Sequence, residues 1–307
     1  IRSWHYCIFI KIARRLIVAK IIILIPVYND WKSLSKLLEN INFQIKDIKH
    51  DFSLIIINDA SLEQKAIYAP SLENLNSVKL INMRENRGHA RCIAAGLKYI
   101  CESEEFDYVI PMDSDGEDRP EELKNFVEHS NYSPDKAIVG ERTKRSEGTF
   151  FKICYEIHKV LTFSFTGQSI KYGNYTCIPK LIVKKMLNEK ATWSSFSGSL
   201  AKIAKDRTTV PSERGLRYFG PSKMSFKNLI IHSLSIISVF KFSVLIRAIF
   251  FLIIYFFLIH QNVSIIMLIP FILIFLLVFL VFRISRRENL NELHNSLNNI
   301  SDTEILK

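Results

Sequence analysis

The 307-residue sequence predicts an open α/β domain followed by helices that associate with a membrane. Short apolar runs rich in β-branched residues alternate with segments of helical spacing over the first 145 residues, which is typical of a parallel sheet with connecting helices. Apolar residues then gather between about 229 and 282, in stretches long enough to cross a bilayer. The 48% hydrophobic fraction therefore reflects two regions of different character.

Five strands are expected in the α/β region. They lie at residues 21–27, 52–57, 78–81, 106–112 and 136–139. Helical spacing of apolar residues predicts helices at 31–43 and between Gly88 and Ile100. Beyond Arg145 the alternation fades, and residues 150–165 form an amphipathic, strongly aromatic segment.

Polar side chains follow the predicted strands where each one ends. Tyr28, Asp59, Asp113 and Asp115 all occupy such positions. Ligands of open α/β sheets bind at the carboxyl ends of the strands, so these residues are expected to share one site.

The segment Asp113–Ser114–Asp115 is the clearest candidate for chemistry. Two carboxylates at a strand end, with Glu117 as a third oxygen source, suit a divalent cation (Mg or Mn) shared with a diphosphate. The alternative is a solvated acidic turn. Asp59 is expected to accept a hydrogen bond from a nucleotide base or else to cap a helix, and Tyr28 to pack against the base or simply be half-buried.

Cationic residues further along the chain suit phosphate binding. Arg142 and Arg145 follow the fifth predicted strand, and Arg217, Ser222 and Lys223 precede the amphipathic region. Arginine binds phosphate through two parallel hydrogen bonds. Attraction to anionic lipid is the competing explanation for Lys223.

The net charge of +11 favours anionic partners, and the absence of zinc-finger spacing and of an aromatic–basic repeat argues against nucleic acid.

Five scattered cysteines argue against a disulfide framework or zinc site and favour a reducing, cytosol-facing catalytic part. Homo-oligomerisation is left open. The first twenty residues carry five Lys and Arg residues and no acid; we interpret this start of the chain as a basic segment near lipid, with a signal peptide as the alternative.

The C-terminal region is expected to hold two transmembrane helices. Residues 222–246 are amphipathic and favour a helix in the bilayer interface, with a core helix as the alternative. Residues 244–259 and 263–282 are the predicted spans, with a loop free of Lys and Arg between them and three arginines after the second. The positive-inside rule places both ends, and the catalytic part, on the cytoplasmic side of the inner (cytoplasmic) membrane as a multi-pass protein.

These features divide the chain into five parts. They are a basic segment at 1–19, a catalytic domain at 20–221, amphipathic juxtamembrane helices at 222–243, two spans within 244–282, and a polar, mobile cytoplasmic tail at 283–307.

An ordered set of motifs resembles family 2 glycosyltransferases. The motifs are Ile-Pro-Val-Tyr-Asn-Asp at 25–30, Ile-Asn-Asp-Ala-Ser at 57–61, Asn-Arg-Gly-His-Ala at 86–90, Met-Asp-Ser-Asp-Gly-Glu-Asp-Arg-Pro-Glu at 112–121, Gly-Glu-Arg at 140–142 and Gly-Pro-Ser-Lys at 220–223. With the two spans, the chain is similar to the dolichol-phosphate mannose synthase and polyprenyl-phosphate glucosyltransferase branch. The resemblance implies the A-type (GT-A) fold, a Rossmann-like mixed sheet, and an inverting transfer.

The resemblance also implies roles for individual residues. The nucleotide-sugar, a UDP- or GDP-sugar, would be bound by Pro26, Tyr28, Asp59, Arg87, Gly88, Asp113 and Ser114. Catalysis would depend on Asp115, Arg142 and Arg217, the metal on Asp113, Asp115 and Glu117, and the acceptor phosphate on Arg145, Ser222 and Lys223. Two departures stand out: Asn58 replaces the first of two usual aspartates, and 171–175 replaces the branch's usual Asp and Gly-Phe-Arg stretch.

The expected acceptor is a polyprenyl (lipid) phosphate. A hydroxyl acceptor needs a general base, whereas a phosphate is already an anion. Residues 191–204 contain no acid, although Glu213 remains a candidate base, so transfer to a glycan or glycolipid hydroxyl in cell-surface polysaccharide synthesis is the alternative. Two further hypotheses are a haloacid-dehalogenase-like phosphatase, suggested by 109–116, and a non-catalytic scaffold that binds a nucleotide-sugar.

Overall fold

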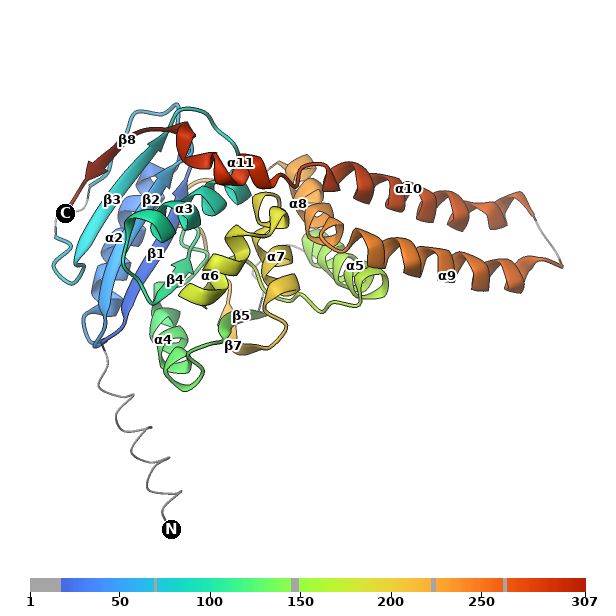
Figure 1. The fold of residues 1–307 in the computed structure, drawn as a ribbon, viewed down its shortest axis with the longest axis horizontal. Helices are drawn as coiled ribbons and strands as arrows, with labels where there is room; N and C mark the ends of the chain where they lie inside the picture. Colours follow the sequence, from blue (N-terminus) through green and yellow to red (C-terminus); the bar gives the residue numbers. More distant parts are fainter. Residues whose placement is uncertain (1–17, 69–70, 145–148, 222–224, 262–263) are drawn as a thin grey trace, which may run out of the picture.

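The computed structural model describes residues 18–68, 71–144, 149–221, 225–261 and 264–307. Figure 1 shows an α/β domain from which a pair of long helices projects to one side. Most of the predicted basic segment at 1–19 lies outside the described residues.

One eight-stranded mixed sheet forms the frame of the α/β domain. Its spatial order is β7-β5-β6-β4-β1-β2-β3-β8. Four central strands are parallel, because β1 pairs with both β2 and β4, and β2 pairs with β3. The strands are β1 (Lys20–Val27), β2 (Asp51–Asn58), β3 (Ser77–Met83), β4 (Tyr108–Pro111), β5 (Ala137–Lys144), β6 (Thr176–Pro179), β7 (Arg207–Glu213) and β8 (Ile300–Ile305).

Helices cover both faces of the sheet, which explains the continuous apolar runs of the central strands. Ile21, Ile23 and Ile25 of β1 pack on one side with α2 and α4, whereas Ile22 and Leu24 pack on the other with α3, α6 and α7. These helices are α2 (Trp31–Ile45), α3 (His89–Ser103), α4 (Leu123–Tyr132), α6 (Lys180–Leu187) and α7 (Phe196–Ile203). Short 3₁₀ helices are η1 (Pro120–Glu122) and η2 (Lys190–Trp193).

All five predicted strands are present, but the sequence prediction missed three others, β6, β7 and β8. β6 has only four residues, and β7 reads Arg-Thr-Thr-Val-Pro-Ser-Glu, which has no apolar run because the strand lies at the edge of the sheet. β5 also continues to Lys144, since β7 pairs with it in parallel. The expectation that Arg142 follows the strand is therefore wrong: Arg142 lies inside β5, opposite Ser212.

The polar C-terminal segment is folded, so the prediction of a mobile tail is wrong. After the projecting helices the chain returns along the domain as α11 (Leu290–His294), η4 (Ser296–Asn299) and β8. Leu293 is fully buried against Ala94 and Trp193, and β8 pairs antiparallel with β3 and forms the edge of the sheet. A short strand on an open sheet edge gains its stability from backbone pairing and needs no apolar pattern in the sequence.

Four helices form the region beyond the sheet. They are α5 (Thr149–Thr166), α8 (Phe226–Ser238), α9 (Lys241–Ile259) and α10 (Ile269–Ser285), with η3 (Ile265–Leu268) before the last. The predicted amphipathic segment is divided: the start of α8 is exposed at Phe226, while its end is buried at Ile236 and Ile237. Arg247 of α9 donates to the Ser164 carbonyl near the end of α5 (3.2 Å), which joins the hairpin to the domain.

Two segments are long and apolar enough to cross a membrane, judged by length and composition. They are Lys241–Ile259 and Ile265–His294, with mean hydropathies of 2.6 and 3.4. Very little of either is buried inside the protein, and large side chains such as Phe257 and Phe275 are exposed along them. Contiguous exposed apolar surface of this kind marks contact with lipid or a partner. The helical pair therefore indicates membrane association.

Replacing Leu293 by Ala should destabilise the full-length protein by about 2–5 kcal/mol, because the substitution leaves a cavity where the return segment packs on the domain. Thermal or denaturant unfolding in detergent measures this. Leu62→Ala, at a leucine that is 86% exposed, is the matched control and should change stability little. Equal effects of the two substitutions would contradict the docked position of the return segment.

Candidate active site

Asp59 holds together two loops at the carboxyl edge of the sheet. It follows β2, and its two carboxylate oxygens accept hydrogen bonds from the backbone N–H groups of Arg87 and Gly88, both at 2.9 Å. Gly88 has φ +89°, which a side chain would strain, and it immediately precedes α3. Burial raises the pKa of Asp59, while the two N–H donors oppose that rise.

Asp113 follows β4 and faces His89. Its Oδ1 lies 3.3 Å from Nε2 of His89 but makes no well-aligned hydrogen bond, although the atom is buried. Burial favours the neutral acid, but the charge of His89 outweighs it, so the pKa of Asp113 is well below its usual range. His89 Nε2 also lies 2.8 Å from Nδ2 of Asn174, in the segment leading to β6.

Asp115 is paired with an arginine from a distant part of the chain. Its Oδ2 accepts a hydrogen bond from Nη1 of Arg217 at 2.6 Å, and Nη2 of the same arginine binds Asp30. Oδ1 of Asp115 accepts the Glu117 N–H at 3.0 Å. Burial and the neighbouring charge of Asp113 raise the pKa of Asp115 to about 6.

A third aspartate, Asp118, lies beneath the pair. It is almost fully buried and accepts the backbone N–H of Asp113 at 3.0 Å. Burial, together with the charge of Asp113, raises the pKa of Asp118 to about 8. The site therefore stabilises the charge of Asp113 but disfavours full ionisation of Asp115 and Asp118 beside it.

Arginines surround the acidic cluster. The charges of Arg142 and Arg214 help to lower the pKa of Asp113. The guanidinium of Arg142 packs closely against Gly173. A Cβ added to Gly173 would lie only 2.9 Å from Nη2 of Arg142. Arg214 pairs with the carboxylate of Glu117.

The two aspartates fit a divalent cation bound together with a diphosphate. Mg²⁺ and Mn²⁺ usually take one or two carboxylates and complete their shell with water and phosphate oxygens. The buried Oδ1 of Asp113, without a well-aligned donor, is an oxygen of the kind such an ion needs. Among the residues the structure describes, no three acidic, His or Cys side chains converge on one metal position. Glu117, the predicted third ligand, is instead directed to Arg214.

The structure brings most of the predicted site together at one edge of the sheet. Ser114 is half-buried between the two aspartates, Tyr28 is 37% exposed after β1, and Pro26 is buried within β1. Arg87 contributes its backbone to Asp59, while its side chain pairs with Glu85 at 2.8 Å. The three residues predicted to bind the acceptor phosphate, Arg145, Ser222 and Lys223, lie outside the described residues.

Sequence reasoning missed several residues of the cluster. His89 lies in the motif at 86–90 and Asp118 in the motif at 112–121. Their titratable side chains, next to predicted site residues, were the signal that could have identified them. Asp30, Asn174 and Arg214 are far from the aspartates in the sequence, and only the folded chain brings them close.

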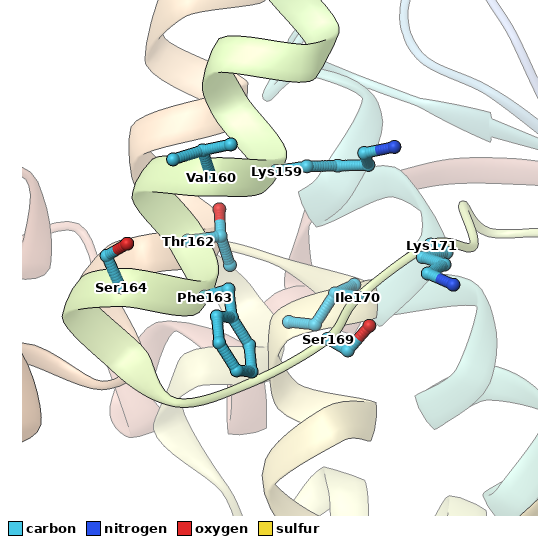
Figure 2. A pocket seen from close by; sticks show the side chains of 8 residues that line it. All are labelled: Lys159, Val160, Thr162, Phe163, Ser164, Ser169, Ile170 and Lys171. Carbon is cyan, nitrogen blue, oxygen red and sulfur yellow. The ribbon is translucent and has the colours of Figure 1, made fainter.

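A cavity of about 250 Å³ lies at the end of α5, in the part of the domain nearest the projecting helices. Figure 2 shows Phe163 and Ile170 on facing walls, with Lys159 from α5 and Lys171 from the following loop beside them. α5 also exposes an apolar stripe along one face, made of Ile153, Ile157, Val160 and Phe163. Spacings of three and four residues place these side chains in line.

Comparison with known proteins extends these observations. Residues 22–188 match the sequence model of a family described as "Glycosyl transferase family 2". One curated relative is the undecaprenyl-phosphate 4-deoxy-4-formamido-L-arabinose transferase of Photorhabdus laumondii, which is 28% identical over 222 residues. The alignment covers 69% of this chain and 65% of the relative, so the chain spans just under two thirds of that protein's length.

Two solved structures share the fold. Glucosyl-3-phosphoglycerate synthase from Mycobacterium tuberculosis, in complex with Mn²⁺, UDP-glucose and glycerol 3-phosphate, is 13% identical, with a TM-score of 0.51 over 76% of this chain and 82% of that chain. S. aureus TarS 1–349 in complex with UDP-GlcNAc is 15% identical, with a TM-score of 0.50 over 91% of this chain and 88% of that chain. At these identities the likeness shows the fold alone.

The family match bears out the resemblance seen in the motifs, and the shared fold bears out the predicted GT-A architecture. Because the family match extends over more than half of the chain, this chain belongs to glycosyl transferase family 2.

Proposed function

We propose that this protein transfers a sugar, with inversion, from a nucleoside-diphosphate sugar to a polyprenyl phosphate at the cytoplasmic face of the inner membrane. The observation that carries the proposal is the acidic and arginine-rich cluster around Asp113 and Asp115, in a domain attached to two candidate membrane spans.

The donor half of the reaction is supported by the geometry at the carboxyl edge of the sheet. Asp59 and the two N–H groups that it accepts form one end of the site, where a nucleotide base is expected. Asp113, Asp115 and Arg217 form the other end, where a diphosphate and its cation are expected. The donors in the two solved structures named above are UDP-sugars, which fits this arrangement.

In the proposed reaction, a phosphate oxygen of the acceptor attacks the anomeric carbon opposite the leaving nucleoside diphosphate. The new C–O bond forms as the bond to the diphosphate breaks, which inverts the anomeric centre. A divalent cation, when bound, neutralises charge on the leaving diphosphate. Arg217, fixed between Asp30 and Asp115, holds a positive charge at the same position without reorganising during the reaction.

The acceptor half is supported by the surface near the projecting helices. The apolar stripe on α5 and the cavity beside it offer an apolar surface with Lys159 and Lys171 at its edge. Each lysine is paired with a glutamate, Glu156 or Glu141, which an incoming lipid phosphate would replace as its partner. The Photorhabdus laumondii relative carries undecaprenyl phosphate in its name. Glu213, the candidate base for a hydroxyl acceptor, is paired with Arg119 at 3.3 Å, which disfavours its action as a base.

Asp115→Asn should lower sugar transfer by about 100-fold or more, because the substitution removes a charge from the diphosphate site and leaves Arg217 paired with Asp30 alone. Asp113→Asn should have a similar effect. Nucleoside-diphosphate release in full-length protein, measured with added Mg²⁺ or Mn²⁺, tests this. Asp47→Asn, at an exposed aspartate in the turn just after α2, is the matched control. Wild-type turnover in the Asp115 variant would contradict the site assignment.

Purified protein should transfer labelled sugar to undecaprenyl phosphate and give a lipid product that mild acid cleaves. A sugar phosphodiester is labile in this way, whereas a glycoside formed on a hydroxyl is more stable. A glycolipid with free hydroxyls is offered in parallel as the competing acceptor. Transfer to the glycolipid, with none to the lipid phosphate, would favour the alternative function.

The loop between the spans should face away from the cytoplasm, because it carries no Lys or Arg while Arg283, Arg286 and Arg287 follow the second span. In intact cells, His260→Cys should react with a membrane-impermeant maleimide and Asp47→Cys should not. Both variants should react once the membrane is permeabilised. The reverse pattern in intact cells would overturn the proposed orientation.

A further inference from the structure

The return segment 286–307 reaches the two loops that frame Asp59. It follows α10, packs through α11 against the domain, and ends in β8 on the open edge of the sheet (Figure 1). Its hydrogen bonds with the domain include bonds to Glu85, in the loop after β3, and to Asn82 within β3, beside the edge where the donor nucleotide is proposed to bind.

Asn299 makes the first link, to the loop between β3 and α3. Its backbone carbonyl accepts the N–H of Arg84 at 2.7 Å, and its side-chain Oδ1 accepts the N–H of Glu85 at 3.2 Å. Its Nδ2 donates to the Glu85 carbonyl at 2.9 Å. The loop is therefore held on both sides just before Arg87 and Gly88, whose N–H groups bind Asp59.

A second link runs through amide side chains from β8 to the loop after β2. Nδ2 of Asn82 donates to Asp302 at 2.7 Å and to Glu304 at 2.8 Å. Oδ1 of Asn82 accepts from Nδ2 of Asn58 at 2.9 Å, and Oδ1 of Asn58 accepts the N–H of Ser61 at 2.9 Å. Asn58, the departure from the family's usual aspartate, is thus both donor and acceptor in this chain of bonds.

The same chain of bonds ends at a backbone conformation that needs support. Ser61 Oγ accepts the N–H of Asn29 at 2.9 Å. Asn29, the donor, and Ala60, the residue before Ser61, have φ of 49° and 54°, in the left-handed region that non-glycine residues rarely occupy. Such conformations persist where surrounding contacts fix them, and they gather at ligand sites.

We propose that the return segment positions the donor-nucleotide loops, and that Asn299 is a positioning residue for the nucleoside diphosphate. The proposal rests on the proposed function for the identity of the ligand. Asn299 itself does not contact Asp59; it acts through the backbone at Arg84 and Glu85. The segment that follows the second candidate span thereby completes the proposed nucleotide site.

A purely structural strand would have different consequences. Loss of edge-strand packing lowers stability and the fraction of active protein, which reduces kcat but leaves the affinity of the remaining active protein unchanged. Loss of positioning weakens nucleotide binding and raises the donor KM while the domain stays folded. The two roles are therefore separable by measurement.

The test compares Asn299→Ala with Asn298→Ala in the full-length protein in detergent. Asn299→Ala removes both side-chain hydrogen bonds to Glu85 and leaves the backbone bond to Arg84 in place. Asn298 is the exposed neighbour of the same type and serves as the control. Two quantities are measured: amide hydrogen exchange of residues 84–92 without ligand, and the Kd for UDP and for GDP with Mn²⁺. Exchange at β1 and β2 reports whether the domain remains folded.

Exchange at residues 84–92 should be about tenfold faster in Asn299→Ala, with β1 and β2 unchanged, because two hydrogen bonds are lost locally. The Kd of the nucleotide that binds should rise about tenfold, equivalent to about 1.4 kcal/mol. Asn298→Ala should match wild type in both. Unchanged exchange, or faster exchange with unchanged Kd, would overturn the positioning role. Wild-type protein that binds neither UDP nor GDP and transfers no sugar would overturn the proposed function. The exchange measurement, made without ligand, would still show whether Asn299 holds the loop, so the two failures are distinguishable.

Discussion

Negative charge is concentrated where β4 ends, and side chains from distant elements are arranged around it. Asp113, Asp115 and Asp118 are too close together and too buried to ionise independently, so the pKa of the first falls while those of the other two rise. Their partners come from the start of α3, from β5 and from the segment after β7. Balancing this charge therefore ties the separate parts of the domain together at the proposed site of sugar transfer.

The projecting hairpin is attached to the domain at both of its ends. Before it, Arg217 bridges Asp30 and Asp115, and α8 buries its last turn in the domain core. After it, α11 and β8 bring the chain back to the opposite edge of the sheet. A domain attached at both ends of the hairpin has less freedom to rotate relative to the candidate spans than a domain on a single tether.

The parts of the fold that the sequence predicted share one property: their burial pattern is local. β1 to β5, α2 and α3 are recognisable because strands buried on both faces read as continuous apolar runs and helices as 3.6-residue spacing. β6, β7 and β8 are short or polar edge elements whose stability comes from backbone pairing with distant strands. The site follows the same division: Asp59, Asp113 and Asp115 follow predictable strands, whereas Asp30, Asn174 and Arg214 join them only in the folded chain.

The sequence by itself determined the family, the acidic pair at the end of the fourth strand, and the two apolar segments, because each is encoded in a contiguous stretch of residues. Only the tertiary structure decided which charges face those aspartates and where the C-terminal segment lies. Hydrogen bonds between residues more than 200 positions apart, such as those of Asn299 with Glu85 and of Asp302 with Asn82, leave no periodic signal in the sequence. They depend on the spatial order of the strands, which the packing of the whole chain sets.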